Sequence, residues 1–152
     1  MKYFLYSTDK LVLASSNVRW LDPHADYLLA QEYWAALGQP LAHSTWIAAH
    51  EYGYRYGAIV QNGRIISCAA VWKFSDEAWE IAAVSTLPEY RRKGYSNQVI
   101  TFITRYILEE GRTPVCSTGD ENVAMIATAK SVGYEEVPED KVWWTYPRLP
   151  DF

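Results

Sequence analysis

Short runs of apolar and β-branched residues, several of them alternating with polar ones, recur along the chain and predict β-strands. The segments are residues 2–7, 10–15, 18–21, 56–61, 64–74, 79–86, 113–118, 134–137 and 141–146. We expect the first two to form an N-terminal strand pair around Thr8-Asp9, and Asn62-Gly63 to form the turn of a central hairpin. The last two segments are predicted to close the sheet as an antiparallel pair.

A longer apolar period predicts helices between these strands. Asp22-Pro23 has the residue types that favour a helix start, and residues 26–37 carry apolar side chains at helical spacing before Gly38. Ser44 is predicted to cap a second helix over residues 45–53.

Two further helices follow in the second half of the chain. Apolar residues at helical spacing, ending at Ile107, predict one buried stripe on a helix that Gly111 terminates. A last helix is expected over residues 122–132, ended by Gly133. The order of elements predicts a mixed α/β (α+β) fold with a mostly antiparallel sheet flanked by helices, and not a doubly wound parallel fold.

Composition narrows the class of protein. The chain of 152 residues suits one domain, residues 1–152, and 49% hydrophobic with 21% charged residues is typical of a globular protein. A net charge of −4 argues against nucleic-acid and anionic-membrane binding, which need a broad basic surface. No apolar run is long enough to span a bilayer, and Asp9 and Lys10 interrupt the N-terminal one. We expect a cytoplasmic protein.

Metal binding and disulfide formation find little support in the sequence. Cys68 and Cys116 lie far apart and show no metal-ligand spacing, and a disulfide scaffold is not expected. The histidines His24, His43 and His50 show no ligand spacing either. No metal is therefore expected.

Aromatic residues make up 15% of the chain, with seven tryptophans and twelve tyrosines. One interpretation places them in the core and on edge strands. The other places some of them in a substrate cleft, with Trp46, Trp72, Trp143 and Trp144 as candidates. The sequence leaves both open.

The stretch Arg91-Arg92-Lys93-Gly94-Tyr95-Ser96 concentrates positive charge where a strand passes into a helix. The first turn of a helix has unpaired N–H groups and a partial positive charge, so it binds phosphate groups. Gly94 lets the backbone approach an anion closely, and the small Ser96 does not block it. The P-loop and dinucleotide-binding glycine patterns are absent. The alternative is a solvated basic turn.

Two motifs resemble the GNAT superfamily of N-acetyltransferases. Arg91, Gly94 and Ser96 fit its Gln/Arg-x-x-Gly-x-Gly/Ala acetyl-CoA motif, with serine in the last place. Residues 87–90 resemble the Pro-x-Tyr/Trp sequence that commonly precedes this motif in the family. The segment from Asn122 to Tyr134 resembles its second motif, a helix that begins at Asn and ends in Gly-Tyr. The resemblance covers roughly residues 18–146, and residues 1–16 look like an addition to it.

This resemblance implies a splayed sheet with a V-shaped cleft for the pantetheine arm of acetyl-CoA. The backbone of Val84, Ser85 and Thr86 would bind that arm, and Asn122 would lie near it. The loop of Arg91, Arg92, Lys93, Gly94, Tyr95 and Ser96 would bind the pyrophosphate. The implied reaction is direct acyl transfer from acetyl-CoA to a primary amine of a small molecule or a protein.

Glu80 is the candidate general base, because a protonated amine cannot attack. It lies fourteen positions before Gly94 and between apolar neighbours, and partial burial would raise its pKa toward neutrality. That position resembles the general-base glutamate of some family members. The alternative is that Glu80 is an outward-facing polar residue of an alternating strand.

One departure concerns the general acid. Many family members carry a tyrosine seven positions after the Asn of the second motif, and here that position is Ala129. Tyr134 and Tyr106 are weak substitutes, and Cys116 is read as a buried apolar residue. A catalytically weak acyl-CoA-binding sensor is therefore the alternative function, with a non-CoA interaction domain as a third. Edge strands near the C-terminus leave room for a homodimer.

Overall fold

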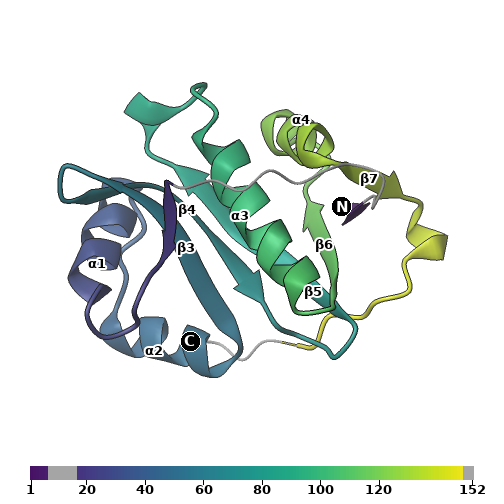
Figure 1. The fold of residues 1–152 in the computed structure, drawn as a ribbon, viewed down its shortest axis with the longest axis horizontal. Coiled ribbons are helices and arrows are strands. Elements are labelled where there is room, and N and C mark those ends of the chain that lie inside the picture. The colour runs from purple at the N-terminus through teal and green to yellow at the C-terminus, as the bar shows by residue number, and fades with distance from the viewer. Residues whose placement is uncertain (7–16, 149–152) are drawn as a thin grey trace.

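The computed structural model describes residues 1–6 and 17–148, which form one seven-stranded sheet flanked by helices (Figure 1). The strands are β1 (Lys2–Tyr6), β2 (Val18–Trp20), β3 (Tyr54–Gln61), β4 (Arg64–Trp72), β5 (Ala78–Thr86), β6 (Thr113–Thr118) and β7 (Tyr134–Val137). The helices are α1 (Tyr27–Ala36), α2 (His43–Glu51), α3 (Tyr95–Glu109) and α4 (Val123–Val132), with short 3₁₀ turns at Pro88–Tyr90 and Glu139–Lys141. The predicted mixed, mostly antiparallel fold is confirmed.

The strand order is β2-β3-β4-β5-β6-β1-β7, and every pair is antiparallel except β5 and β6. The hairpin between β3 and β4 turns at Asn62 and Gly63, with φ of 52° and 75°. Two consecutive positive φ angles are what an Asn-Gly hairpin turn requires. This turn follows the sequence prediction.

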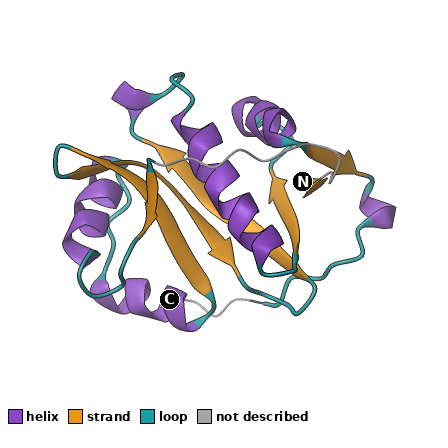
Figure 2. Cartoon of the chain, viewed as in Figure 1, coloured by secondary structure: helices purple, strands orange, loops and turns teal. Residues whose placement is uncertain are grey.

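The helices cover both faces of the sheet, as the ribbon in Figure 2 shows. Neighbouring residues of β3 point to opposite faces. The Arg55 guanidinium lies over Trp20 and beside Tyr106 of α3, whereas the Tyr56 ring packs against Trp34 of α1 and Trp46 of α2. Helices α3 and α1–α2 therefore lie on opposite faces. The main core fills both interfaces.

Both predicted helices of the first half start elsewhere than expected. The carboxylate of Asp22 accepts hydrogen bonds from the backbone N–H groups of His24 and Ala25, so it caps a turn, and α1 begins only after Asp26. Helix α2 begins at His43 with Ala42 at its N-cap, so Ser44 lies inside the helix and does not cap it. The absence of a side-chain cap at Ala42 explains why the sequence signal was misleading.

The termini depart most from the prediction. Strand β1 lies inside the sheet, with β6 on one side and β7 on the other, while the strand expected at residues 10–15 falls outside the described residues. The predicted pair of residues 134–137 with 141–146 is wrong. Strand β7 pairs with β1 instead, and the segment 142–148 forms no strand. We call residues 142–148 the C-terminal segment.

The C-terminal segment packs against the sheet instead of extending it. In Figure 1 it runs back from the β7 side beneath the lower ends of β6 and β5. Trp144 is 6% exposed and forms a small second core with Ala78 of β5 and Val115 of β6. The segment therefore covers the face of β5 and β6 that carries Glu80, since Ala78 and Glu80 are two residues apart on one strand.

Candidate active site

Strands β5 and β6 separate after a short contact. Their parallel pairing covers only Ala78 to Glu80 against Thr113 to Val115. Beyond this vertex a cavity of about 1020 Å³ opens, lined by β5 from Glu80 to Thr86 on one side and by Ser117 and Thr118 of β6 on the other. The predicted V-shaped opening lies here, and its volume suits a large organic ligand.

A β-bulge interrupts β5 inside the opening. Ala82 pairs with Ala70 and Ser85 with Cys68, so Ala83 and Val84 have only one residue opposite them on β4. Ala83 has a φ of 52°, a conformation that costs free energy for a residue with a Cβ. The bulge bends the strand away from a regular ladder. The edge of β5 that faces β6 beyond Glu80 has no ladder partner among the described residues. The carbonyls of Ser85 and Thr86 accept hydrogen bonds from Ser67 and Arg91, and the remaining backbone groups are available to an extended ligand.

The loop between β5 and α3 forms the outer end of the cavity. Gly94 is the N-cap of α3 with a φ of 83°, and Arg92 also has a positive φ of 62°. The backbone N–H groups of Tyr95, Ser96 and Asn97 have no intrahelical partner because they lie in the first turn of α3. No side chain caps this helix and its first turn contains no acidic residue, so these groups are left for a ligand. Left-handed residues in such a loop turn backbone N–H groups toward an anion.

Side chains fix this loop to the sheet. The Nε of Arg91 donates to the carbonyl of Thr86 at 3.0 Å, and the hydroxyls of Thr86 and Ser96 lie 2.8 Å apart. The Thr86 hydroxyl also bonds Ser67 of β4. Because the last residue of β5 holds both the arginine and the first turn of α3, the cation and the helix N-terminus keep a fixed geometry.

The charge of the loop is not neutralised internally. Within residues 1–6 and 17–148, no carboxylate pairs with Arg91, Arg92 or Lys93. Arg91 and Arg92 line the cavity, but Lys93 does not, and its Nζ lies 5.7 Å from the ring centre of Tyr90. All the predicted cofactor-binding residues except Lys93 therefore surround one cavity.

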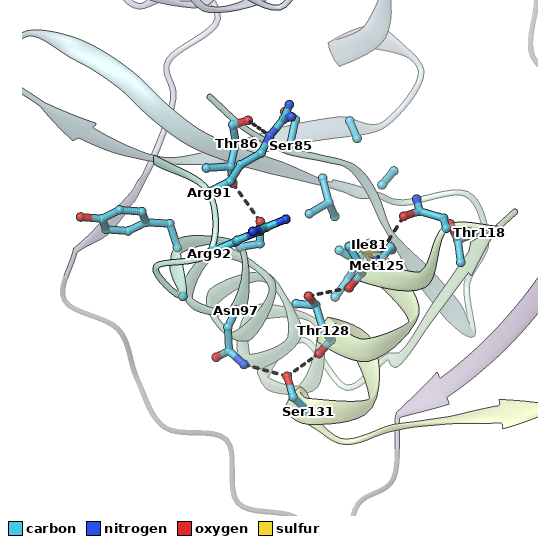
Figure 3. Close-up of a pocket in the computed structure, with 18 of the residues that line it drawn as sticks. Ile81, Ser85, Thr86, Arg91, Arg92, Asn97, Thr118, Met125, Thr128 and Ser131 are labelled. Carbon is cyan, nitrogen blue, oxygen red and sulfur yellow. Dashed lines mark hydrogen bonds between the residues drawn. The ribbon is translucent and has the colours of Figure 1, made fainter. Parts of the chain in front are cut away.

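Helix α4 forms the opposite wall, and most of its contribution was missed from the sequence. Figure 3 shows Met125, Thr128 and Ser131 on this helix facing Asn97 and the arginines across the cavity. The Nδ2 of Asn97 donates to the hydroxyl of Ser131 at 3.0 Å, which joins α3 to α4. Asn122, Met125, Thr128 and Ser131 recur every three residues, a spacing that makes each residue a neighbour of the next on the helix surface. This periodicity was the signal available in the sequence.

Asn122 has a structural role in addition to its place on the cavity wall. Its Oδ1 accepts the backbone N–H of Met125 at 3.2 Å and so caps α4. Capping uses the carbonyl side of the amide, which leaves its NH₂ group for a ligand.

Glu80 lies at the vertex, where the paired part of β5 ends. Burial raises the pKa of its carboxyl group to about 7, and the nearby Tyr146 hydroxyl partly opposes this shift. Water stabilises a carboxylate better than a protein interior does, so a carboxyl with a pKa near neutrality exchanges a proton readily at physiological pH. The interpretation of Glu80 as an outward-facing surface residue does not fit its surroundings.

The other candidate catalytic groups lie elsewhere. Ala129 is buried, the hydroxyl of Tyr134 is buried against Thr104 at 2.7 Å, and Tyr106 packs on Trp20. Burial raises the pKa of Cys116 to about 12, so it stays a thiol. Within the described residues no group of three or more His, Cys, Asp or Glu side chains is placed to hold a metal ion. Likewise, no described helix has the length and apolar character needed to cross a membrane.

The tryptophans serve the core and not the cavity. Trp46 and Trp72 are 1% and 5% exposed, and neither lines the opening between β5 and β6. Their indole N–H groups donate to the backbone carbonyls of Pro23 and Tyr52. Trp143 is exposed, and Trp144 is buried in the second core.

Comparison with known proteins identifies the family. A family model described as the acetyltransferase (GNAT) family matches residues 13–134. The chain belongs to the GNAT family. A search of curated proteins gives no match.

Solved structures with the same fold include members of this family. One is a putative GNAT acetyltransferase from Novosphingobium aromaticivorans, with a TM-score of 0.69 and 22% identity over 88% of this chain. The match covers 58% of that chain, so the present chain spans little more than half of its length. A second is the ribosomal-protein-S18-alanine N-acetyltransferase of Escherichia coli, with a TM-score of 0.66 and 19% identity over 80% of this chain and 78% of the other.

A third is the aminoglycoside N-acetyltransferase AAC(6')-Iy in complex with CoA. Its TM-score is 0.62, with 15% identity over 87% of this chain and 99% of the other. At these identities the likeness concerns the fold alone.

Proposed function

We propose that this chain is an acetyl-CoA-dependent N-acetyltransferase that acts on a primary amine by direct attack. The observation that carries the proposal is one continuous cavity, with an uncapped helix N-terminus and two arginines at its outer end and a buried carboxyl group at its vertex. An anion site at one end and a carboxyl group with a pKa near 7 at the other suit a ligand that has a phosphate at one end and a reactive group at the other.

The residues present fit CoA. The N–H groups of Tyr95 and Ser96, with the guanidinium groups of Arg91 and Arg92, would hold its pyrophosphate. The free edge of β5 at Val84 and Ser85 would pair with the amides of its pantetheine arm. The CoA complex of AAC(6')-Iy supports this assignment by analogy of fold.

Acetyl-CoA would supply a thioester, and the residues of this chain would prepare the amine. An alkyl ammonium has a pKa near that of lysine, about 10.4, so most of it is protonated at neutral pH and cannot attack. Glu80, with its pKa raised to about 7, is partly ionised at pH 7 and accepts that proton. Trp144 packs beside the vertex with Ala78 and Val115, and Glu80 is partly buried there.

The buried Ala129 favours a second candidate, an acyl-CoA-binding sensor with little turnover. The tyrosines that line the cavity, Tyr90 and Tyr95, both lie at its outer end, far along β5 from Glu80. No phenol among the cavity-lining residues therefore reaches the vertex to protonate a leaving thiolate. A thiol of ordinary pKa, about 8.5, leaves without strong acid assistance, so we favour the enzyme.

Location and partners complete the proposal. Cys68 and Cys116 are free and buried, as in proteins of a reducing compartment, and we place the activity in the cytoplasm. The acceptor is a small-molecule or protein amine. Nucleic acid and membranes are not expected as partners at a net charge of −4.

A paired binding and turnover experiment tests the proposal. Calorimetry with acetyl-CoA measures binding, and thiol release in the presence of a panel of amines, including aminoglycosides and peptides with free N-termini, measures transfer. Binding with amine-dependent thiol release is the expected result. Binding without release for any amine would favour the sensor, and absence of binding would rule out both.

A further inference from the structure

The C-terminal segment brings the hydroxyl group of Tyr146 to the vertex. Because β1 occupies the edge of β7, residues 142–148 are free to cross the sheet face beneath β5 and β6. Trp144 anchors this crossing between Ala78 and Val115, the residues that flank Glu80 in the β5–β6 pairing. Tyr146 follows two residues later and is partly buried.

Ring stacking fixes the position of Tyr146. Its ring lies parallel to that of Trp72, with centroids 5.8 Å apart and 8° between the planes. Tyr54 also stacks on Trp72, with centroids 5.3 Å apart and 7° between the planes. Trp72 is the residue directly opposite Glu80 on the neighbouring strand, so Tyr146 is held over the position next to this carboxyl group.

The hydrogen bonds of Tyr146 orient its hydroxyl hydrogen. The indole Nε1 of Trp144 donates to the Tyr146 oxygen at 3.0 Å, and an indole N–H only donates. The hydrogen of the phenol therefore remains free for an acceptor, and the groups it faces are the carboxyl of Glu80 and the hydroxyl of Ser117. An ionised carboxylate is the stronger acceptor.

Neutral titratable groups interact with Glu80 in the described part of the chain. The titratable side chains that interact with it are Tyr54 of β3, Cys116 of β6 and Tyr146 of the C-terminal segment. Burial raises the pKa of each, so all three are neutral near pH 7. Tyr146 is the member of this group whose hydroxyl lowers the pKa of Glu80 and so favours its ionised form.

We propose that Tyr146 is the positioning residue of Glu80, and that its hydroxyl, held by the indole N–H of Trp144, keeps the carboxylate directed into the cavity. The catalytic part of this inference rests on the proposed function, because it assumes that Glu80 is the base. The stacking of Tyr146 on Trp72, the residue opposite Glu80, does not. Tyr146 touches neither ligand and acts only through Glu80, which explains why it does not line the cavity.

Tyr146→Phe in the full chain tests the inference. This variant removes the hydroxyl and keeps the stacked ring. A ¹³C NMR titration of the Glu80 carboxyl in the ligand-free protein, assigned with Glu80→Gln, should show its midpoint rise by roughly one pH unit. In the transfer assay, kcat at pH 7 should fall roughly tenfold while the KM for acetyl-CoA stays unchanged.

Two further variants provide controls. Tyr54→Phe removes a hydroxyl from the other end of the same stack and should leave the Glu80 midpoint in place. Trp144→Phe removes the N–H that orients Tyr146 and should shift the midpoint in the same direction as Tyr146→Phe, by less. In a Glu80→Gln background, Tyr146→Phe should cause no further loss of rate, since its effect passes through Glu80.

The outcomes separate this inference from the proposed function. An unchanged Glu80 midpoint in a folded Tyr146→Phe protein would overturn the positioning role, whatever the activity. An equal shift in Tyr54→Phe would also overturn it, because the effect would then come from the stack and not from the hydrogen bond. A shifted midpoint in a chain without transferase activity would support the hydrogen bond and reject the function.

Discussion

The two ends of the cavity are built in different ways. The outer end is formed by consecutive residues, from Thr86 to Ser96, and is exposed, cationic and rich in backbone N–H groups. The vertex combines Glu80 of β5, Trp72 of β4 and Tyr146 of the C-terminal segment, and it is buried and carries one titrating carboxyl group. The outer end is therefore built from residues that are neighbours in the sequence, whereas the vertex is built from segments that only the folded sheet brings together.

This difference separates binding from chemistry. At the outer end a fixed charge and a helix N-terminus attract an anion regardless of the exact pH, because arginine stays protonated. At the vertex burial sets a pKa near neutrality, so the state of the group depends on pH and on one neighbouring hydroxyl. Changes at one end should therefore alter affinity and changes at the other should alter rate.

The largest expected effect comes from the vertex. Glu80→Gln keeps the shape of the side chain and removes the base, so the transfer rate at pH 7 should fall by about 10²- to 10⁴-fold. The inflection that ionisation of this carboxyl gives to the wild-type pH–rate profile near pH 7 should disappear with it, while the rise that follows deprotonation of the amine, of pKa about 10.4, should remain. Steady-state kinetics from pH 5.5 to 9 measures both.

Acetyl-CoA affinity provides the control for this variant, because calorimetry should give the wild-type value if the vertex serves chemistry alone. A pH–rate profile of Glu80→Gln that still has an inflection near pH 7 would assign the base to another group. A large loss of affinity would instead remove the division between the two ends.

Changes at the outer end should lower the affinity for acetyl-CoA, whereas changes at the vertex lower the rate. Combining Arg91→Glu with Gly94→Asp places negative charge and a Cβ-bearing residue where φ is 83°, and acetyl-CoA affinity should fall by about 100-fold, roughly 3 kcal/mol. Lys93→Glu is the matched control, since Lys93 lies outside the cavity wall, and its effect should be several-fold at most. Calorimetry at fixed ionic strength distinguishes them, and wild-type affinity in the double variant would show that the anion binds elsewhere.

The residues predicted for the outer end lie together in the structure because they are neighbours along the chain. The three cations, Gly94 and the start of α3 lie within a few residues, so the strand-to-helix junction was visible without tertiary information. Lys93 is the predicted residue that does not line the cavity, and which way a long exposed side chain turns depends on its neighbours in space, here the ring of Tyr90. The general fold followed in the same way from apolar periods and turn residues.

The vertex was only half predicted, and the reason is competition between strands. Glu80 was found from its offset to Gly94, but residues 141–146 were assigned to a strand because their aromatic and β-branched pattern favours one. The edge of β7 that this strand needed is occupied by β1, more than 120 residues away in sequence. Local propensity contains no information about that pairing, so the approach of Tyr146 to Glu80 could not be predicted.

The smallest expected effect tests the buried state of Glu80 without any ligand. Its pKa is raised from 4.5 to about 7 in the folded protein, so the folded state binds more protons than the unfolded state between these values. The stability that the neutral carboxyl contributes is present below pH 4.5 and is lost as the pH rises through 7. Relative to Glu80→Gln, the wild-type protein should lose on the order of 1–2 kcal/mol of unfolding free energy between pH 5 and 8.

Urea denaturation at both pH values measures this difference, with Glu77→Gln, an exposed glutamate three residues upstream, as the matched control. The control should show no comparable change, because an exposed carboxylate is solvated in both states. If Glu80→Gln and the wild-type protein lose stability in parallel from pH 5 to 8, the carboxyl is not held in a buried environment. The contrast between a charged outer end and a neutral vertex would then be wrong, and the rate effect of Glu80→Gln would need another cause than a base tuned by burial.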